Sequence, residues 1–345
     1  MVCAKRAHVA PDDDNNYNCI DDERQNKNDM RLRMHPPFLK QRENFRGRAG
    51  QSSQASQRSS GVMVAEAFHR ALGFVFLAAF LSLASQLDVL ISSNGLLPID
   101  PFLRWLSTEK PEIGFWKFPT VFWWGAGDFW VLNLVWLGTA AALSAALGFN
   151  PRLMIGISMV IYLSYATACR DFLYFQWDNM LLESGLLALF LPRDRPARWI
   201  HILFRILLFK LYFESGIAKW QSFLQDWHDG SAMTHYYETS PIPTWLAWYF
   251  HHLPEWWHHL ESRAVLVLEL IIPFFIFGPR VGRLFAFVSF TGFQVVNILT
   301  ANYGFFCYQA LILHLFLLDE RDLHWTEKFV HFPYRYSLAS KPTPA

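Results

Sequence analysis

Six charged side chains interrupt apolar segments in the middle of the sequence. A charge in an apolar environment costs about 3 kcal/mol unless it is paired or hydrated. The segments FQWDNMLLESGLLALFLP and LFRILLFKLYFESGIAKW hold Asp178, Glu183, Arg205, Lys210, Glu214 and Lys219. We therefore predict a buried ion-pair network in which the two segments pack face to face and Glu183 meets Arg205 or Lys219.

The spacing of these charges supports the pairing. Lys210 and Glu214 are four residues apart and could pair along one helix, which leaves Arg205 and Lys219 in need of partners. Small residues would let the two segments approach closely, namely Ser184, Gly185, Ser215 and Gly216. The simplest role for the network is a structural latch between helices.

Lys219 is the one residue of this set with acid–base potential. An amine at the end of an apolar helix can lose its charge when it is desolvated, and can then act as a base. The structural alternative, which we favour, is a lysine that lies along apolar surface and reaches water at the membrane interface. We therefore assign no catalytic residue and keep Lys219 as the candidate base of an enzyme alternative.

Two long loops, about 92–128 and 218–262, are rich in Trp, Pro and His. The segment TSPIP in the second loop predicts an extended, rigid backbone, because proline fixes φ. Aromatic rings favour the membrane interface, so a pair of interfacial lids is the simpler interpretation. Aromatic rings also dominate protein contacts. We predict a client-contact loop formed by His235, Tyr236, Tyr237, Glu238, Trp245, Trp248, Tyr249 and Trp256.

Other site chemistries have little support in the sequence. The histidine pairs at 251–252 and 258–259 match no metal signature such as HExxH, and Pro254 interrupts any helix that would join them. There is no GxSxG motif, phosphate-binding glycine loop or dinucleotide fingerprint. The sequence therefore predicts no metal site and no cofactor.

The composition indicates what kind of secondary-structure elements must position these residues. Hydrophobic residues make up 52% of the 345 residues and charged residues only 17%, whereas soluble chains carry about 25% charge. The net charge of +1 gives no sign of a nucleic-acid partner.

Apolar runs recur from Phe68 onward, and a bilayer-spanning helix needs about 20 such residues. The runs are about 70–91, 129–148, 153–169, 172–191, 199–217, 263–279, 284–300 and 304–318. The runs that contain GLLALFLP and LVLELIIPFFIFG are marginal as isolated spans and could be re-entrant or packed inside the bundle. We predict an all-α fold, a polytopic transmembrane helical bundle of about 6–8 spans with two Trp/Pro/His-rich extramembrane loops.

Arginine placement predicts the orientation. Basic residues concentrate in alternate short loops, at Arg152, at Arg193, Arg195 and Arg198, and at Arg280 and Arg283. The positive-inside rule places these loops and the amino terminus in the cytoplasm. Both long loops would then lie on the outer or lumenal face.

The chain divides into three parts by composition. Residues 1–62 hold almost no periodic apolar residue, which indicates a disordered tail or a mis-annotated start with translation from Met63. Residues 63–320 form the expected transmembrane domain, and 321–345 a short polar carboxy-terminal tail.

Several motifs of the transmembrane part resemble one known family. The motifs are GLLP at 95–98, FQWDNMLLESG at 175–185, LFRILLFK at 203–210, ESGIAKW at 214–220, HYYETSPIPTWLAWYFHHLP at 235–254, LELIIPFFIFGPR at 268–280 and TANYGFF at 300–306. In this order they resemble the membrane part of the lipase maturation factor family. Family members usually continue into a soluble carboxy-terminal domain, which we do not expect in this chain because it stops at Ala345.

The resemblance implies a membrane protein that assists the folding and maturation of secreted lipases. The expected partners are the lipid bilayer and a secreted lipase or other client protein. The expected location is the endoplasmic reticulum membrane in a eukaryote and the inner membrane in a bacterium.

Two other function classes stay open. ESGIAKW and the Trp-rich loop after it also resemble the vitamin K-dependent γ-carboxylase group, in which a lysine acts as base, and only Lys219 has a counterpart here. This second resemblance implies a membrane-embedded enzyme as the alternative. A small-molecule carrier is the third class, since intramembrane charges also mark substrate paths, although the sequence shows no inverted repeat. The leading prediction is a non-enzymatic membrane assembly factor.

Overall fold

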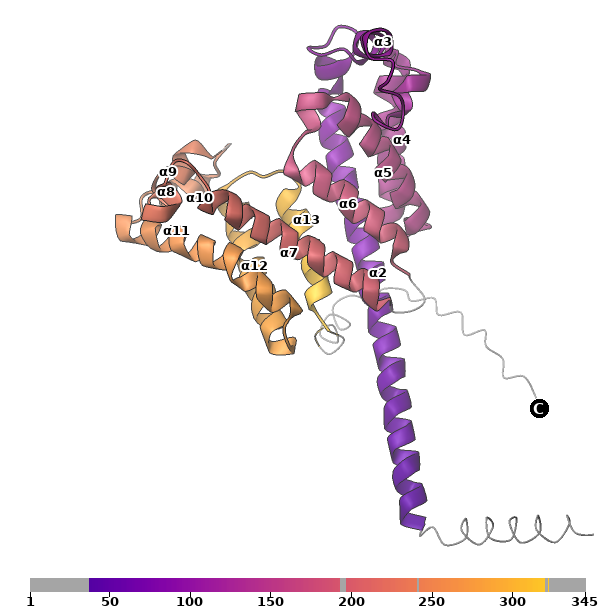
Figure 1. Ribbon diagram of the computed structural model, residues 1–345, viewed down its shortest axis with the longest axis vertical. Helices are drawn as coiled ribbons and strands as arrows, with labels where there is room; N and C mark the ends of the chain where they lie inside the picture. The colour runs from indigo at the N-terminus through magenta and orange to yellow at the C-terminus, as the bar shows by residue number, and fades with distance from the viewer. Residues whose placement is uncertain (1–36, 193–196, 241, 320–321, 323–345) are drawn as a thin grey trace, which may run out of the picture. The chain divides into compact units, whose positions relative to one another are not determined.

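The computed structural model describes residues 37–192, 197–240, 242–319 and 322, with side chains from Val64 onward. Within these residues the secondary structure consists of helices without strands, which confirms the all-α prediction (Figure 1). The long helices are α2 (Pro37–Ile91), α4 (Asp128–Ala146), α5 (Pro151–Ala168), α6 (Gln176–Phe190), α7 (Arg198–Trp220), α11 (Glu255–Leu270) and α12 (Arg280–Thr300). The shorter ones are α3 (Ile99–Glu109), α8 (Asp226–Asp229), α9 (Ala232–Thr239), α10 (Trp245–His251), α13 (Phe306–Leu313), and the 3-10 helices η1 (Val121–Trp124), η2 (Arg170–Leu173), η3 (Ile272–Phe277) and η4 (His314–Leu317).

The two expected tails fall largely on residues that the structure does not describe. Residues 1–36 of the amino-terminal tail lie outside the described residues, and the backbone of 37–62 belongs to α2. Of the carboxy-terminal tail, only Asp322 is described.

Three helices among the described residues are long and apolar enough to cross a membrane, by length and composition. They cover Val64–Ile91, Asp128–Ala146 and Arg280–Thr300, and a shorter apolar helical stretch covers Phe306–Leu317. The predicted run 263–279 is interrupted, because α11 ends at Leu270 and Pro273 has no backbone donor to continue it. The number of crossings stays a prediction.

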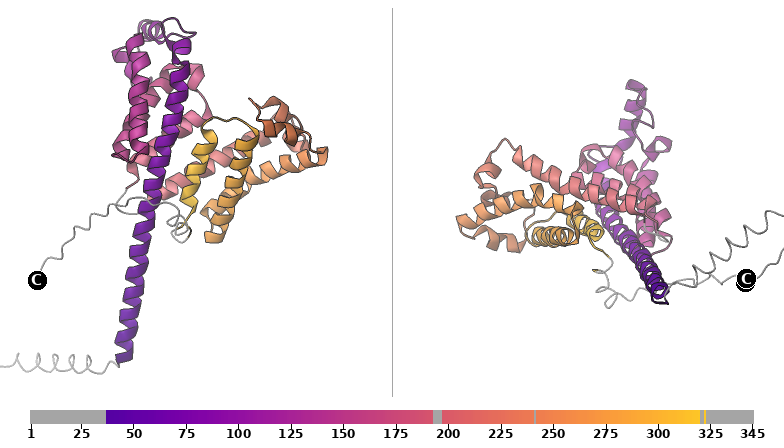
Figure 2. Two further views of the ribbon diagram at one scale, coloured as in Figure 1. Left: turned by 180° about the vertical axis from the view of Figure 1, so that it is seen from behind. Right: turned by 60° about the horizontal axis from the view of Figure 1, so that its bottom comes forward.

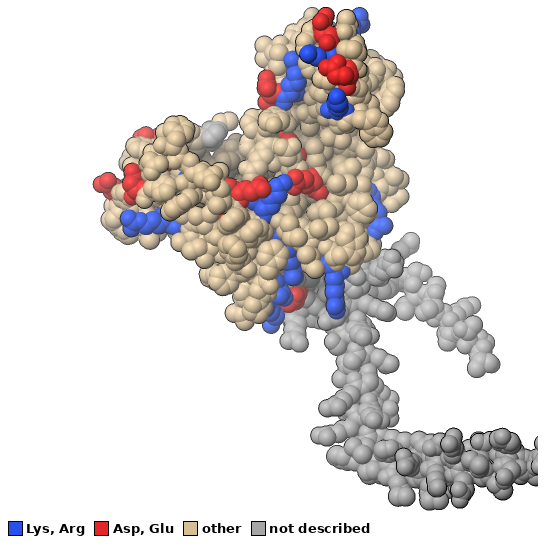
Figure 3. Space-filling view, viewed as in Figure 1, with Lys and Arg blue, Asp and Glu red and all other residues tan. Residues whose placement is uncertain are grey.

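The core lies where the apolar part of α2 meets α7 and the chain after α13. The ring of Phe68 lies 4.7 Å from that of Phe204 and 4.9 Å from that of Phe316. The rings of Phe204 and Phe316 stack at 4.0 Å. Figures 1 and 2 show α4 and α5 side by side with the upper part of α2, and Figure 3 shows a face with few charges. Such a surface suits an apolar surrounding.

α7 packs closely against α11, and the small residue that permits this is Gly216. A Cβ added there would lie 2.8 Å from the Leu270 side chain and 3.0 Å from the Glu269 backbone. From the sequence, Gly216 and Gly185 are expected at the contact between α6 and α7. That expectation was wrong, because Gly185 faces Phe76 of α2.

The predicted loop 218–262 includes the end of α7 and the first turns of α11. Between these two helices lie α8, α9 and α10, of which α8 and α9 contact α11 and α10 contacts α12. Met233, Tyr237 and Ala247 form a small separate core. The TSPIP segment is extended at Ser240, but Ile242 has a φ of 46°, in the left-handed region, so the predicted extended backbone is interrupted at Ile242. Pro241 lies outside the described residues.

Candidate functional site

The carboxy-terminal end of α7 carries an ion pair with α11. Lys219 Nζ donates to both carboxylate oxygens of Glu269, at 2.8 Å to Oε1 and 2.7 Å to Oε2. The Glu269 side chain is only 4% exposed and that of Lys219 is 28% exposed. The Lys219 ammonium also lies 5.5 Å from the centre of the Trp227 ring, where the π face attracts a cation.

This pair borders a cavity of about 220 Å³. Helices α6, α7, α8, α9, α11 and α12 and the chain at 303–306 all contribute to its wall. The polar and aromatic side chains that line it are Gln176, Trp177, Tyr212, Ser215, Lys219, Trp227, Tyr236, Glu269, Phe293, Gln294, Asn297, Tyr303 and Phe306. The arrangement offers both hydrogen-bonding groups and apolar walls to one small ligand.

A chain of hydrogen bonds leads from this cavity into the bundle. Gln294 Nε2 donates to the Tyr212 hydroxyl at 3.0 Å. That hydroxyl lies 3.0 Å from His314 Nε2, and His314 Nδ1 lies 3.0 Å from the Thr291 hydroxyl. The donor directions agree if Tyr212 donates to His314 and His314 donates to Thr291, and Gln294 Oε1 is then the one atom of this chain without a partner among the described residues.

The structure brings Glu183 together with Lys210 instead of Arg205 or Lys219. Their Oε1 and Nζ atoms lie 2.7 Å apart, and both side chains are more than two fifths exposed. Glu214, one turn after Lys210, is exposed as well. The expected local pair of Lys210 and Glu214 is thus replaced by a contact between helices. Figure 3 shows a short row of acidic and basic side chains where α6 and α7 run.

Asp178 joins no ion pair among the described residues. Its carboxylate accepts a hydrogen bond from the Tyr162 hydroxyl at 2.5 Å and one from the Phe175 backbone at 3.3 Å. Asp178 therefore stabilises the first turn of α6, where backbone donors lack partners within the helix. Its predicted place in an ion-pair network is corrected to a helix-capping position.

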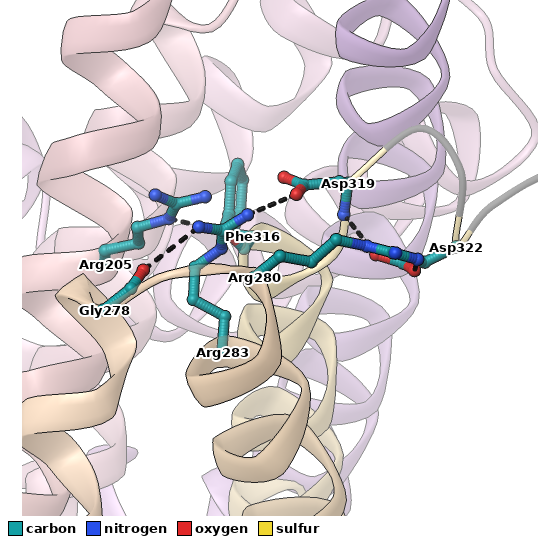
Figure 4. Close-up of polar contacts among 7 residues, drawn as sticks. All are labelled: Arg205, Gly278, Arg280, Arg283, Phe316, Asp319 and Asp322. Atoms are coloured by element: carbon teal, nitrogen blue, oxygen red, sulfur yellow. Dashed lines mark hydrogen bonds and ion pairs between the residues drawn. The ribbon is translucent and has the colours of Figure 1, made fainter.

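Arg205 lies at the other end of α7, in a cluster with α12 and the end of the described chain (Figure 4). Its Nε donates to the Phe316 carbonyl at 2.9 Å. Arg283 donates to the Gly278 carbonyl at 3.1 Å and pairs with Asp319. The partner that Arg205 needed is thus a carbonyl oxygen, which the sequence pattern could not indicate.

Arg280 extends the same cluster by pairing with Asp322. Burial opposes ionisation of the Asp322 carboxyl, but hydrogen bonds from Arg280 and from the Asp319 backbone hold its pKa below the usual value. Two aspartates therefore offset much of the basic charge at this end of the bundle.

The predicted client-contact residues separate into a buried and an exposed group. Tyr237 is 3% exposed and its hydroxyl donates to Glu261 Oε1 at 3.1 Å. Tyr236 bonds the Tyr303 hydroxyl beside the cavity. Burial raises the pKa of Tyr236, Tyr237 and Tyr303 above the ordinary value of a tyrosine. Tyr237 is therefore corrected from a contact residue to part of the loop interior, and Tyr236 is half-buried in the cavity wall.

The remaining aromatic residues of that set face outward. Trp245, Trp248, Tyr249 and Trp256 are 58% to 74% exposed. His235 is exposed on α9, and the Glu238 carboxylate lies 3.0 Å from His251 Nε2.

The histidines of the loop serve local contacts. His258 Nδ1 lies 3.3 Å from Glu261 Oε2 and its Nε2 lies 3.2 Å from the His251 carbonyl. His228 Nε2 lies 2.7 Å from the Trp220 carbonyl. In the part of the chain that the structure describes, no three His, Cys, Asp or Glu side chains gather as a metal site would require.

Glu269, Gln294 and His314 are residues of the site that were not predicted from the sequence. Glu269 had a signal, because it is an acidic residue within the apolar run 263–279 and needs a partner there. Gln294 and His314 are uncharged, and only the fold shows that they meet Tyr212.

Comparisons with known proteins agree with the arrangement of apolar helices. A family model described as the lipase maturation factor transmembrane domain matches residues 63–325. Lipase maturation factor 2 of Rattus norvegicus is 36% identical over 285 residues, which cover 74% of this chain and 40% of that relative. Lipase maturation factor 2 of Homo sapiens is 35% identical over 288 residues, with the same two shares.

Lipase maturation factor 1 of Bos taurus is 31% identical over 274 residues, which cover 74% of this chain and 48% of that relative. The chain thus spans less than half the length of these three relatives. No solved structure matches it. The match of the transmembrane model over most of the chain identifies a helical membrane protein, and the chain belongs to the lipase maturation factor family.

Proposed function

We propose that this chain is a non-enzymatic membrane factor that assists the folding or assembly of secreted client proteins, such as lipases. The family to which it belongs supports the client class. The observation that carries the proposal is the group of exposed aromatic side chains on loop 218–262, formed by Trp245, Trp248, Tyr249 and Trp256.

Hydrogen bonds to α11 and α12 fix the loop that carries these side chains. The Met233 backbone donates to Ser262 Oγ at 3.1 Å, and Tyr237 bonds Glu261 of the same helix, α11. Thr244 hydrogen-bonds backbone carbonyls at the end of α12. A surface that is ordered before binding loses less entropy when it binds, and large rings contribute most of the energy at protein interfaces.

The proposed location follows from the same clients. Secreted lipases fold in the lumen of the endoplasmic reticulum, so the loop is useful on the lumenal face of that membrane in a eukaryote. In a bacterium the corresponding place is the outer face of the inner membrane.

The experiment removes three rings from the loop and compares the loss with a matched control. Trp245→Ala, Trp248→Ala and Trp256→Ala are combined in one variant. The control combines Trp105→Ala, Trp116→Ala and Trp124→Ala, three exposed tryptophans of the chain segment 92–128. Both are expressed with a homodimeric secreted lipase, and co-purification and secreted lipase activity are measured.

We expect co-purification to fall at least tenfold in the first variant and little in the control, at equal amounts of protein in the membrane. Each buried ring at an interface can contribute about 2 kcal/mol, so the loss of three is readily detected. Equal losses in both variants, or unchanged co-purification in the first, would show that the rings are only membrane-interface anchors.

Lys219 fits a structural role better than that of a base. A base needs the lone pair of its amine, whereas Nζ of Lys219 donates to both oxygens of Glu269. The cavity beside it is the feature that an enzyme alternative requires, but the ion pair must first separate to provide a base.

A further inference from the structure

The cavity beside Lys219 has a chemical character that the client-binding proposal does not use. Aromatic side chains form its apolar wall, among them Trp177, Phe293 and Phe306. The polar side is formed by Lys219 and Glu269 together with Gln294. A volume of about 220 Å³ exceeds what a few ordered waters fill and suits a small headgroup with the adjoining part of a chain.

The charges in this cavity cancel. The Lys219 ammonium and the Glu269 carboxylate are in direct contact at 2.7 Å. An anionic headgroup would meet the carboxylate and a cationic one the ammonium, and desolvation would add to either cost. The cavity therefore favours an uncharged headgroup.

Gln294 adds a requirement for hydrogen bonding. The residue is 2% exposed, and its Nε2 donates to the Tyr212 hydroxyl at 3.0 Å. Its Oε1 has no hydrogen-bond partner among the described residues. A buried carbonyl oxygen without a donor costs about 1–3 kcal/mol, so a ligand that supplies the donor, once the Gln294 amide turns toward the cavity, gains this amount.

Lys219 supplies the complementary group. Two of its three N–H groups point to Glu269, which leaves one donor for a ligand. A hydroxyl group can both accept from Lys219 and donate to Gln294. A hydroxyl would satisfy Gln294 in either orientation of its side-chain amide, because it is donor and acceptor at once.

We propose that this cavity binds a neutral amphiphile with a hydroxyl-bearing headgroup, of the monoacylglycerol type, with its chain along the aromatic wall. The site stands apart from the outward-facing tryptophans of the loop. It can therefore be tested without a client protein.

The test uses the full chain in phosphatidylcholine nanodiscs and a monoacylglycerol that carries a photoreactive diazirine in its chain. A fatty acid and a fatty amine with the same chain and diazirine serve as charged counterparts. Labelling is measured against concentration, with unlabelled monoacylglycerol as competitor, and the labelled peptides are mapped. We expect saturable labelling by the monoacylglycerol on α7, α11 or α12, and at least tenfold weaker labelling by both charged probes.

Gln294→Met removes the amide at similar volume, and we expect it to weaken labelling about tenfold, the effect of one hydrogen bond of about 1.4 kcal/mol. The matched control is Gln309→Met, because Gln309 is an equally buried amide on α13 that does not line this cavity. Thermal unfolding of both variants checks that they fold. If Gln294→Met does not accumulate, Val265→Phe replaces it, since Val265 lines the cavity and a larger side chain there narrows it.

Equal labelling by all three probes would show that the cavity has no preference for the headgroup and would overturn the proposal. The same conclusion follows if Gln294→Met and Gln309→Met label alike, or if unlabelled monoacylglycerol does not compete. The cavity would then hold only water or bulk lipid.

Discussion

Burial distinguishes the two lysine ion pairs of α7. Glu269, the partner of Lys219, is almost fully enclosed, whereas Glu183 and Lys210 are each more than two fifths exposed. Removing one member of a buried pair leaves an uncompensated charge, but an exposed pair contributes less than about 1 kcal/mol. The two pairs should therefore respond very differently to the same substitution.

We predict that Glu269→Gln lowers the free energy of unfolding by about 3 kcal/mol or more, and that Glu183→Gln lowers it by less than about 1 kcal/mol. Thermal or denaturant unfolding in nanodiscs measures both. The double variant Lys219→Met, Glu269→Leu should recover most of the loss, because it leaves no buried charge. A double variant as unstable as Glu269→Gln would contradict a role for the ion pair. A stable double variant that loses lipase secretion would favour the enzyme alternative.

The sequence showed which charges needed partners but not where the partners were. Lys219 and Glu269 are 50 residues apart, on helices whose order in space the apolar pattern does not encode. Arg205 donates to the Phe316 carbonyl. Because every residue has a backbone carbonyl, the sequence does not show which carbonyl at a helix end accepts a hydrogen bond from a side chain. Glu183 lies on the neighbouring apolar run, but that run forms α6, which contacts α5 more than it contacts α7.

At the scale of helices, the approach of α7 to α11 determines whether the cavity and its ion pair exist. Gly216 is the position of closest approach, where a Cβ would contact the backbone and side chain of Glu269 at 3.0 Å. A backbone atom cannot move aside as the end of a side chain can, so the two helices would have to separate.

We predict that Gly216→Ala destabilises the protein by about 1–3 kcal/mol, the usual cost of overpacking. Gly292→Ala is the matched control on α12, because nothing lies within 4 Å of the Cβ that it adds. An alanine within a helix should stabilise it by about 0.5–1 kcal/mol at that position. Unfolding midpoints of the two variants that shift in the same direction would contradict the close packing of α7 and α11.

The apolar runs predicted that the chain forms helices. They predicted less well where a helix ends and which residues of a loop are buried. Pro273 signalled the end of α11, and the run around it was already marginal in length. The sequence could not tell that Tyr237 turns inward while Trp245 and Trp248 turn outward. All three are aromatic, and only the contacts of short helices α9 and α10 with α11 and α12 separate them.

For the molecule as a whole, the orientation in the membrane links the fold to the proposed function. Arg205, Arg280 and Arg283 lie together (Figure 4), and the loop 218–262 follows the opposite end of α7. Positively charged ends stay in the cytoplasm, so the client-contact tryptophans should lie across the membrane from this cluster. A client that folds in the lumen can reach them only in this orientation.

We predict that a cysteine at His252 is lumenal and one at Val281 is cytoplasmic. Both positions are exposed. Of the native cysteines, Cys169 and Cys307 are buried. Cys3 and Cys19 are replaced by serine so that they cannot react with the maleimide. In sealed microsomes a membrane-impermeant maleimide should label Val281→Cys at once and His252→Cys only after the membrane is permeabilised. Labelling of His252→Cys in sealed vesicles would place the loop in the cytosol, where secreted proteins do not fold, and would contradict the proposed client contact.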